Sequence, residues 1–358
     1  MKYRLAQSRH MRYWQEKIPK QHAARQGGNR MKLVVQLPAL NEEATIAEVI
    51  ASIPKTIPGI DAVRVVVVND GSSDRTASLA EAAGAVVVSH EKPRGVGAAF
   101  RSGLMKSSEL GADIIVTMDA DGQFNADDIP ALIRPILNGE ADFVTGSRFV
   151  DPAFIPEMPA VKKWGNDQIA RWVSSMVKIR FYDVSCGFRA YSRNAFLRLV
   201  LLGDFTYTHE VFLSLAFAHV PIKEVPVRVR GVREHGKSRV ANNLFRYGWR
   251  TASIILKTYR DYRPLRFFSK IAAVLTLLGL CFVAFLGYVK WTTGIFTPHK
   301  WSGFVGGAFI GTAIFMFIVG VVAEMLDRIR VAVDESLFRV KRLECTLRDN
   351  GENQPPAP

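Results

Sequence analysis

Cysteine is scarce in this sequence, and the positions of the cysteines are not typical of disulfide-rich or zinc-binding proteins. The 358 residues contain three cysteines, Cys186, Cys281 and Cys345, which lie far apart and form no C-x-x-C pair. This spacing favours neither a disulfide framework nor a zinc site, and it fits a reducing compartment. An apolar signal segment is missing too, because residues 1–30 are basic and contain no apolar run. We interpret them as a disordered extension, and the sequence leaves open whether translation starts there or at Met31.

Two common nucleotide-binding fingerprints are also missing. No G-x-x-x-x-G-K-[ST] string occurs, so the sequence has no P-loop. The string K-P-R-G-V-G at 92–97 is rich in glycine, but Phe100 stands where a dinucleotide motif has its third glycine. Its glycines fit two interpretations equally, a phosphate at a helix N-terminus or room for a helix turn.

Acidic residues are too few to balance the basic ones, and the net charge of +14 predicts an anionic partner. Two uncharged apolar segments, 271–289 and 301–323, are each long enough to cross a hydrocarbon core of about 30 Å. Lysine and arginine gather before the first segment and after the second, so we expect a lipid bilayer as a partner and no nucleic acid. By the positive-inside rule, this asymmetry predicts a transmembrane hairpin with both ends in the cytoplasm.

Strand-like and helical patterns alternate between residue 31 and about residue 230. The expected strands are 33–37, 64–68, 85–88, 113–118 and 143–145, and the expected helices are 43–53, 74–83, 97–110 and 129–137. This order predicts an α/β fold with a mostly parallel sheet. The predicted regions are the extension 1–30, an α/β domain 31–240, interfacial amphipathic helices 241–268, two transmembrane helices 269–325, and a cytoplasmic helix with a disordered tail 326–358.

The string D-A-D-G-Q follows the apolar run 113–118, and it is the strongest candidate site. A parallel sheet binds ligands at the carboxyl ends of its strands. Asp119 and Asp121 are two residues apart, so in an extended chain both carboxylates would face one side. With Gln123 they offer the oxygen ligands that suit Mg²⁺ or Mn²⁺. An isolated D-x-D is also compatible with turn formers and helix caps.

Polar residues follow two other predicted strands. Asn41 in P-A-L-N-E has the character of a helix cap, and Glu42 could accept hydrogen bonds from a base or ribose. In N-D-G-S-S-D we interpret Asp70 as a ligand-binding carboxylate and Asp74 as the cap of the next helix. In T-H-E, a helix start is favoured over catalysis by His209.

Three basic strings come later in the chain. Arg148 in G-S-R could form a two-pronged contact with a phosphate. Arg189 in S-C-G-F-R fits either a phosphate or solvent. The loop from Arg233 to Arg239 has the composition of a segment that closes over phosphates, with a solvated basic linker as the alternative.

Taken in order, these strings resemble glycosyltransferase family 2, and more closely its polyprenyl-phosphate glycosyltransferases such as the dolichol-phosphate mannose synthases. The resemblance covers about residues 32–266. It rests on P-x-x-N-E, D-G-S-x-D, D-A-D-G-Q, G-S-R, S-C-G-F-R, E-V-P-V and R-x-x-G-x-S-[KR]. It implies a GT-A-like nucleotide-binding domain for the α/β region. The chain departs from the family at Arg239, where lysine is common, and at Asn69, where many relatives have a second aspartate.

The resemblance also implies roles for individual residues. The residues expected to bind the nucleotide sugar are Pro38, Leu40, Glu42, Val68, Asp70, Met118, Ala120 and Arg239. The expected metal and diphosphate ligands are Asp119, Asp121 and Gln123. The residues expected to act in catalysis are Asp119, Asp121, Arg148 and Arg233. Three arginines, Arg148, Arg233 and Arg239, are expected near the donor and acceptor phosphates.

The function implied is an inverting, metal-dependent hexosyl transfer at the cytoplasmic face of the membrane. The donor would be a nucleotide-diphosphate sugar, GDP-mannose or a UDP-hexose, and the acceptor a dolichyl or undecaprenyl phosphate. A lipid phosphate, whose second pKa is about 6, is ionised near pH 7 and needs little help from a base. Two alternatives are a membrane-tethered nucleotide- or lipid-binding protein without turnover and a processive polysaccharide synthase. The sequence leaves the sugar and any homo-oligomer open.

Overall fold

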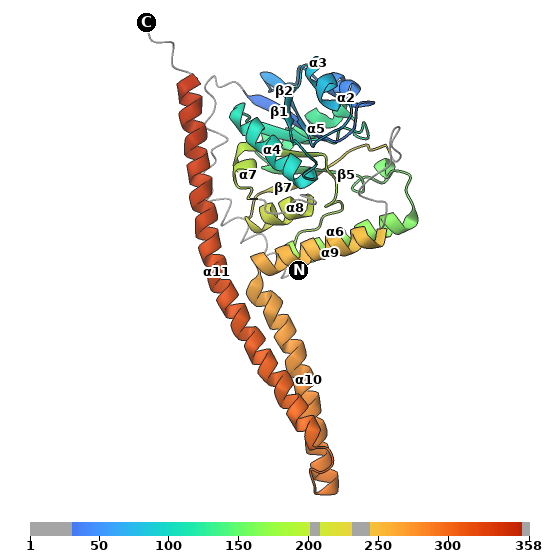
Figure 1. The fold of residues 1–358 in the computed structure, drawn as a ribbon, viewed down its shortest axis with the longest axis vertical. Coiled ribbons are helices and arrows are strands. Elements are labelled where there is room, and N and C mark those ends of the chain that lie inside the picture. The colour runs from blue at the N-terminus through green and yellow to red at the C-terminus, as the bar shows by residue number, and fades with distance from the viewer. Residues whose placement is uncertain (1–30, 201–207, 231–243, 353–358) are drawn as a thin grey trace.

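The computed structural model describes residues 31–200, 208–230 and 244–352, and Figure 1 shows an α/β domain above a long helical hairpin. The sheet of the described chain has seven strands in the order β3-β2-β1-β4-β6-β5-β7. They are β1 (Lys32–Ala39), β2 (Ala62–Asn69), β3 (Val86–Ser89), β4 (Ile114–Thr117), β5 (Phe143–Ser147), β6 (Arg189–Ser192) and β7 (Ile222–Pro226). The expected fold class is confirmed.

The sheet is parallel except at β6, which runs antiparallel to both of its neighbours, β4 and β5. Sequence patterns do not predict this strand, because its residues, R-A-Y-S, form no apolar run and begin with a charge. The helices of the domain are α2 (Ile46–Ser52), α3 (Thr76–Ala82), α4 (Val96–Glu109), α5 (Ile129–Leu137), α6 (Ala160–Val177), α7 (Arg193–Leu197) and α8 (Thr208–Phe217). Short 3₁₀ turns lie at Ala126–Asp128 and Pro152–Phe154.

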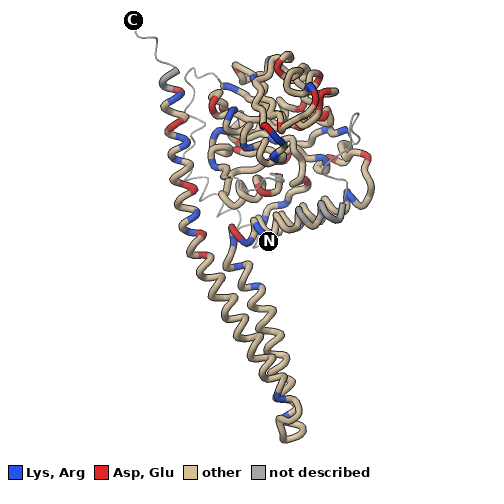
Figure 2. The backbone as a smooth tube through the Cα atoms, in the orientation of Figure 1, with Lys and Arg blue, Asp and Glu red and all other residues tan. Residues whose placement is uncertain are grey.

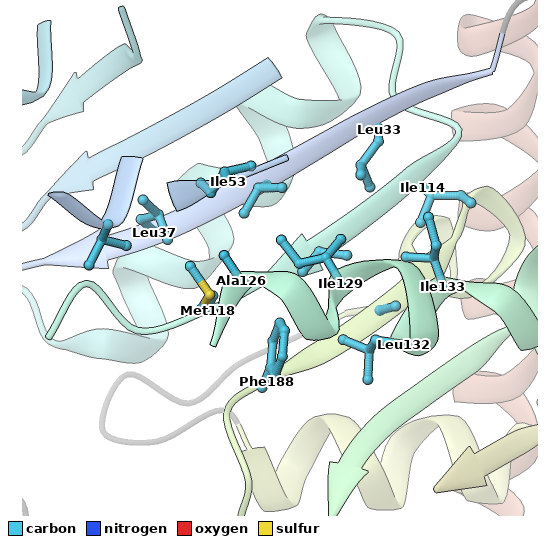
Figure 3. Close-up of a cluster of buried hydrophobic side chains, with 14 of the residues drawn as sticks. Leu33, Leu37, Ile53, Ile114, Met118, Ala126, Ile129, Leu132, Ile133 and Phe188 are labelled. Atoms are coloured by element: carbon cyan, nitrogen blue, oxygen red, sulfur yellow. The ribbon is translucent and has the colours of Figure 1, made fainter. Parts of the chain in front are cut away.

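The central strands β1 and β4 are buried on both faces of the sheet, which explains why their sequences are nearly continuous apolar runs. On one face Leu33 and Leu37 of β1 pack with Ile129 of α5 and with Phe188, as Figure 3 shows. On the other face Val34 packs with residues of α4, α6, α7 and α8. Alternate residues of β1 therefore serve two cores, and together they fix the register that aligns the strand ends.

Three long helices follow the domain: α9 (Leu244–Tyr262), α10 (Pro264–Thr293) and α11 (Lys300–Glu352). Two of them, α10 and α11, are long and apolar enough to cross a membrane. They pack closely where Gly279 meets Gly306, since a Cβ on either would lie 2.8 Å from the carbonyl oxygen of the other. Figure 2 shows that most of the hairpin is uncharged, with cations near its far end.

The last helix differs from the expected pair of separate helices, because α11 continues without a break beyond the apolar segment. Its C-terminal part lies against the α/β domain (Figure 1). Phe338 is buried there beneath the Arg198 guanidinium, and Lys341 Nζ donates to the carbonyl of Leu199 at 3.1 Å. Asp349 forms an ion pair with Arg193 at 2.5 Å. The hairpin is thus attached to the domain at two places, through α9 and through the end of α11.

Candidate active site

The polar motifs of the sequence meet at the carboxyl edge of the central strands. Strands β1, β2 and β4 are parallel neighbours, with Ala39 at the end of β1 paired to Asn69 at the end of β2. Thr45 joins two of the following segments, because its Oγ1 donates a hydrogen bond to the carbonyl of Ala120 at 2.7 Å. The strings P-A-L-N-E, N-D-G-S-S-D and D-A-D-G-Q therefore leave the sheet at one edge, where α/β proteins bind ligands.

Asn41 does not cap the following helix, which corrects our expectation. Helix α2 begins at Ile46 with Thr45 as its N-cap, whereas Asn41 lies in the left-handed region at φ +54°. Its Oδ1 accepts the backbone N–H of Ser73 at 2.8 Å, and its own N–H donates to Ser72 Oγ at 2.9 Å. Asn41 therefore ties the turn after β1 to the turn after β2.

Asp74 is not the N-cap of α3 as we expected, because Arg75 occupies that position and Asp74 lies one residue before it. Its Oδ1 accepts the N–H of Thr76, the first residue of α3, at 3.0 Å. Burial acts to raise the pKa of Asp74, but hydrogen bonds from Thr76 outweigh it and hold the pKa below its usual value. Thr76 Oγ1 in turn accepts the N–H of Glu42 at 2.9 Å, which fixes the main chain of Glu42 at this edge.

Asp70 is buried at the end of β2, and its carboxylate is used by the protein itself. His90 Nδ1 lies 2.7 Å from Oδ1, and the N–H groups of Arg94 and Gly95 donate to the two oxygens at 2.9 and 2.8 Å. Asp70 thus holds the 92–95 loop at the start of α4. The expected contact of Asp70 with a base or ribose stays a prediction.

Asp119 and Asp121 lie in a turn rather than in the strand. Strand β4 ends at Thr117, and Gly122 has a φ of +71°. The alternation of an extended chain, on which we based a common orientation of the two carboxylates, therefore does not apply. Asp121 is buried and Asp119 is partly exposed, and Asp121 Oδ1 accepts the N–H of Gln123 at 3.1 Å.

The S-C-G-F-R segment lies beside Asp119. A Cβ built on Gly187 would lie 3.4 Å from Asp119 Oδ1 and 3.5 Å from Oδ2, so the absent side chain leaves room next to the carboxylate. Thr117 Oγ1 holds this segment by donating to the Gly187 carbonyl at 2.9 Å. A larger residue at 187 would fill the space that a bound group could use.

The donor set fits a divalent cation that a substrate helps to hold. Within the described ranges, no three His, Cys, Asp or Glu side chains cluster as a complete metal site. Mg²⁺ commonly binds through one or two carboxylates and substrate phosphates, which Asp119 and Asp121 can satisfy. Gln123 Nε2 donates to the carbonyl of Arg230 at 3.0 Å, so Oε1 is the side-chain atom of Gln123 that could coordinate a cation.

Arg148 forms its two-pronged contact with a protein carboxylate. Its Nε and Nη2 donate to the two oxygens of Asp183 at 2.7 and 3.0 Å, and Nη2 also donates to Ser185 Oγ at 2.9 Å. Burial acts to raise the pKa of the fully buried Asp183, but the Arg148 charge and the hydrogen bonds hold it below its usual value. Direct contact of Arg148 with a phosphate stays a prediction.

Glu224 of β7 completes this network. Its Oε1 accepts the N–H groups of Tyr182 at 3.1 Å and Asp183 at 2.8 Å. Burial, the largest influence, raises the pKa of Glu224 to about 7 despite these bonds. The string E-V-P-V contributes to the family resemblance, but the sequence did not identify Glu224 or Asp183 as part of a network. Their partners, the Arg148 guanidinium and backbone N–H groups, meet them only in the folded chain, and no local pattern reveals them.

Arg189 binds neither a phosphate nor solvent, which corrects both interpretations of it. It is fully buried, and its guanidinium donates to the carbonyls of Val184 at 2.9 Å, Cys186 at 2.7 Å and Thr208 at 2.7 Å. It joins the S-C-G-F-R segment to the start of α8. His209, at that helix start, is also buried, and burial followed by the Arg189 charge lowers the pKa of His209 to about 4.

The remaining predicted site residues fall into three groups. Arg233 and Arg239 lie outside the described residues. Val68, Met118 and Ala120 are buried in the core, so a nucleotide contact there would come from their main chain. Pro38 and Leu40 are partly exposed at the edge of the sheet.

Comparison with known proteins decides the family. The sequence profile described as Glycosyl transferase family 2 matches residues 34–200. A UDP-N-acetylglucosamine–dolichyl-phosphate N-acetylglucosaminyltransferase of Methanococcus voltae is 34% identical over 176 residues, which are 44% of this chain and 68% of that protein. The chain belongs to glycosyl transferase family 2.

Two further proteins are similar to this family 2 glycosyltransferase, one by sequence and one by structure. A dolichyl-phosphate hexose transferase of Haloferax volcanii is 31% identical over 204 residues, or 55% of this chain and 82% of that protein. Among solved structures, glucosyl-3-phosphoglycerate synthase of Mycobacterium tuberculosis, in complex with Mn²⁺, UDP-glucose and phosphoglyceric acid, is similar with a TM-score of 0.51. The two are 26% identical, and the match covers 64% of this chain and 80% of that one.

Proposed function

We propose that this glycosyltransferase moves a hexose from a nucleotide-diphosphate sugar to a polyprenyl phosphate, with inversion, at the cytoplasmic face of a membrane. One observation carries the proposal: the D-A-D-G-Q turn lies at the carboxyl edge of the sheet, in a domain joined to a hairpin that is long and apolar enough to cross a bilayer. An enzyme that used a soluble acceptor would not need to be joined to such a hairpin.

The donor would lie over the ends of β1, β2 and β4. Pro38, Leu40 and Glu42 follow β1 at this edge, and Asp70 follows β2. The UDP complexes of the solved relative support a nucleotide sugar as donor. Which sugar and which nucleotide are bound depends on the walls of the pocket, so both GDP-mannose and the UDP-hexoses belong in a test.

Asp119 and Asp121 would hold Mg²⁺ or Mn²⁺, with Gln123 nearby, and the ion would neutralise the charge of the leaving diphosphate. The Mn²⁺ in the solved relative supports this assignment. Asp121 is the buried member of the pair, so its carboxylate is fixed in place before the donor binds. Arg233 and Arg239, expected near the phosphates, would offset the repulsion between donor and acceptor.

The acceptor would enter from the bilayer. Helix α9 precedes the hairpin directly and has an outer face with Trp249 and Leu256 exposed, while Ile255 packs into the domain. An amphipathic helix of this kind is suited to lie in the membrane interface. The phosphate oxygen of the polyprenyl phosphate is the nucleophile. Its attack on the anomeric carbon, with departure of the nucleoside diphosphate, inverts the anomeric configuration of the sugar.

The relatives' acceptors support this choice, because two of them are named as acting on dolichyl phosphate. The test is a panel of UDP-N-acetylglucosamine, UDP-glucose and GDP-mannose, assayed with the purified full chain, a short polyprenyl phosphate and Mg²⁺ or Mn²⁺. We expect one donor to give a glycosyl lipid phosphate. Binding of a nucleotide sugar with no transfer under any of these conditions would favour the tethered binding protein instead.

A further inference from the structure

Three polar side chains form a hydrogen-bonded chain behind the turn that follows β2. His90, directly after β3, places Nδ1 2.7 Å from Asp70 Oδ1 and Nε2 2.9 Å from Ser102 Oγ in α4. The side chains of Asp70 and His90 are 5% and 6% exposed. With Nδ1–H donating to the carboxylate, Nε2 can accept the Ser102 hydroxyl proton, so the neutral imidazole satisfies both contacts.

Asp70 also acts as the cap of a helix that belongs to a later part of the chain. Gly95 is the N-cap residue of α4 and has no side chain with which to cap it. The N–H groups of Arg94 and Gly95 donate to Asp70 instead. A carboxylate at the positive end of a helix is favourable, so Asp70 fixes where α4 begins.

The loop before α4 packs tightly on the turn that contains Asp70. Gly71 has a φ of +72°, and a Cβ built on it would lie 2.6 Å from the carbonyl carbon of Lys92 and from the nitrogen of Pro93. The backbone of the loop therefore follows the position of the β2 turn. Any movement of Asp70 would carry the loop and the helix start with it.

We propose that Asp70, His90 and Ser102 act as one positioning unit that holds the 92–95 loop at the edge of the nucleotide pocket. This inference rests on the proposed function, which locates the nucleotide over the ends of β1 and β2. The order of the three groups is that of a hydrolase triad, but Ser102 lies inside α4 and not on a strand-to-helix turn that would expose a nucleophile.

Loss of the imidazole should weaken nucleotide binding more than it slows chemistry. We expect His90→Ala to raise the Kd for UDP or GDP, measured by calorimetry with Mn²⁺ on the full chain, by about tenfold or more. That is the scale of one lost hydrogen bond to a buried charged group. The KM for the donor should rise in parallel, with a smaller change in kcat. Ser78→Ala is the matched control, because Ser78 Oγ bonds only within the exposed surface of α3.

Two conservative variants separate the contacts. His90→Asn can place an amide N–H near the position of Nδ1 and should restore much of the affinity, whereas His90→Gln, whose amide reaches the position of Nε2, should not. Ser102→Ala should raise the Kd about two- to fivefold in the native chain. It should have no further effect in the His90→Ala background, since both then break the same chain of hydrogen bonds.

The outcomes are distinguishable. A native chain that binds neither UDP nor GDP with metal would refute the proposed function itself. Native binding that His90→Ala leaves unchanged, or equal losses in His90→Asn and His90→Gln, would overturn the positioning unit. If His90→Ala does not fold, His90→Asn and Ser102→Ala decide the question: an unchanged Kd in Ser102→Ala and full loss in His90→Asn would reject it.

Discussion

Replacing Asp183 by asparagine should destabilise the protein more than any surface charge substitution. Asp183 is fully buried, and its two oxygens accept bonds from Arg148 Nε and Nη2 and from the N–H groups of Ser185 and Cys186. Asparagine keeps the shape but turns an NH₂ group toward donors and leaves the Arg148 charge uncompensated. Removing one partner of a buried ion pair costs about 3–5 kcal/mol, and the retained amide oxygen should place this variant at the lower end.

The assay is unfolding of the purified full chain by denaturant, with Asp167→Asn as the matched control. Asp167 forms a surface pair with Arg171 at 2.7 Å and is 38% exposed, so its loss should cost less than about 1 kcal/mol. Because the pKa of folded Asp183 lies below its usual value, the stability it supplies is present at neutral pH and is lost as pH falls below about 4. Equal losses for Asp183→Asn and Asp167→Asn at pH 7 would refute this account of the network.

The remaining predictions concern the site, the network and the topology. Asp121→Ala should abolish transfer without unfolding the domain, and near-native transfer with metal chelated would contradict the metal assignment. Glu224→Gln should be more stable than the native chain at pH 8 but not at pH 5, because the folded pKa of about 7 makes ionisation cost stability as pH rises; equal profiles would reject this. Arg233→Ala should reduce transfer by about 10²-fold or more, and Arg239→Lys by less, which steady-state rates can check. A cysteine at Thr293, with the native cysteines replaced, should react with an impermeant reagent from outside the cell. Reaction only from the cytoplasmic side would contradict the predicted orientation of the hairpin.

The sequence predicts a strand well where its residues form an uninterrupted apolar run. Strand β4 is predicted from its apolar run alone, because a run such as I-I-V-T has few alternatives to a buried strand, and this places D-A-D-G-Q at the strand's carboxyl end. The same reasoning could not find β6, whose pairing with β4 and β5 depends on residues that are distant in the chain.

The site was predictable in its residue types but not in its contacts. Local rules made Asn41 a helix cap, yet the bond to Ser73, 32 residues away, holds it elsewhere. Charge alone suggested that Arg189 binds phosphate or solvent, yet folding buries it among carbonyls. In both cases a tertiary partner outweighs a local preference, and no pattern in a single sequence records such a partner.

The most direct test of the proposed function compares two acceptors that differ only in the phosphate. The purified chain, the donor found in the panel and the required metal would be incubated with a polyprenyl phosphate or with the matching polyprenol, and the lipids analysed by mass spectrometry and by the anomeric configuration of the product. The account predicts a glycosyl polyprenyl phosphate of inverted configuration and no reaction with the alcohol. Transfer to the polyprenol at a comparable rate, or a product of retained configuration, would contradict it.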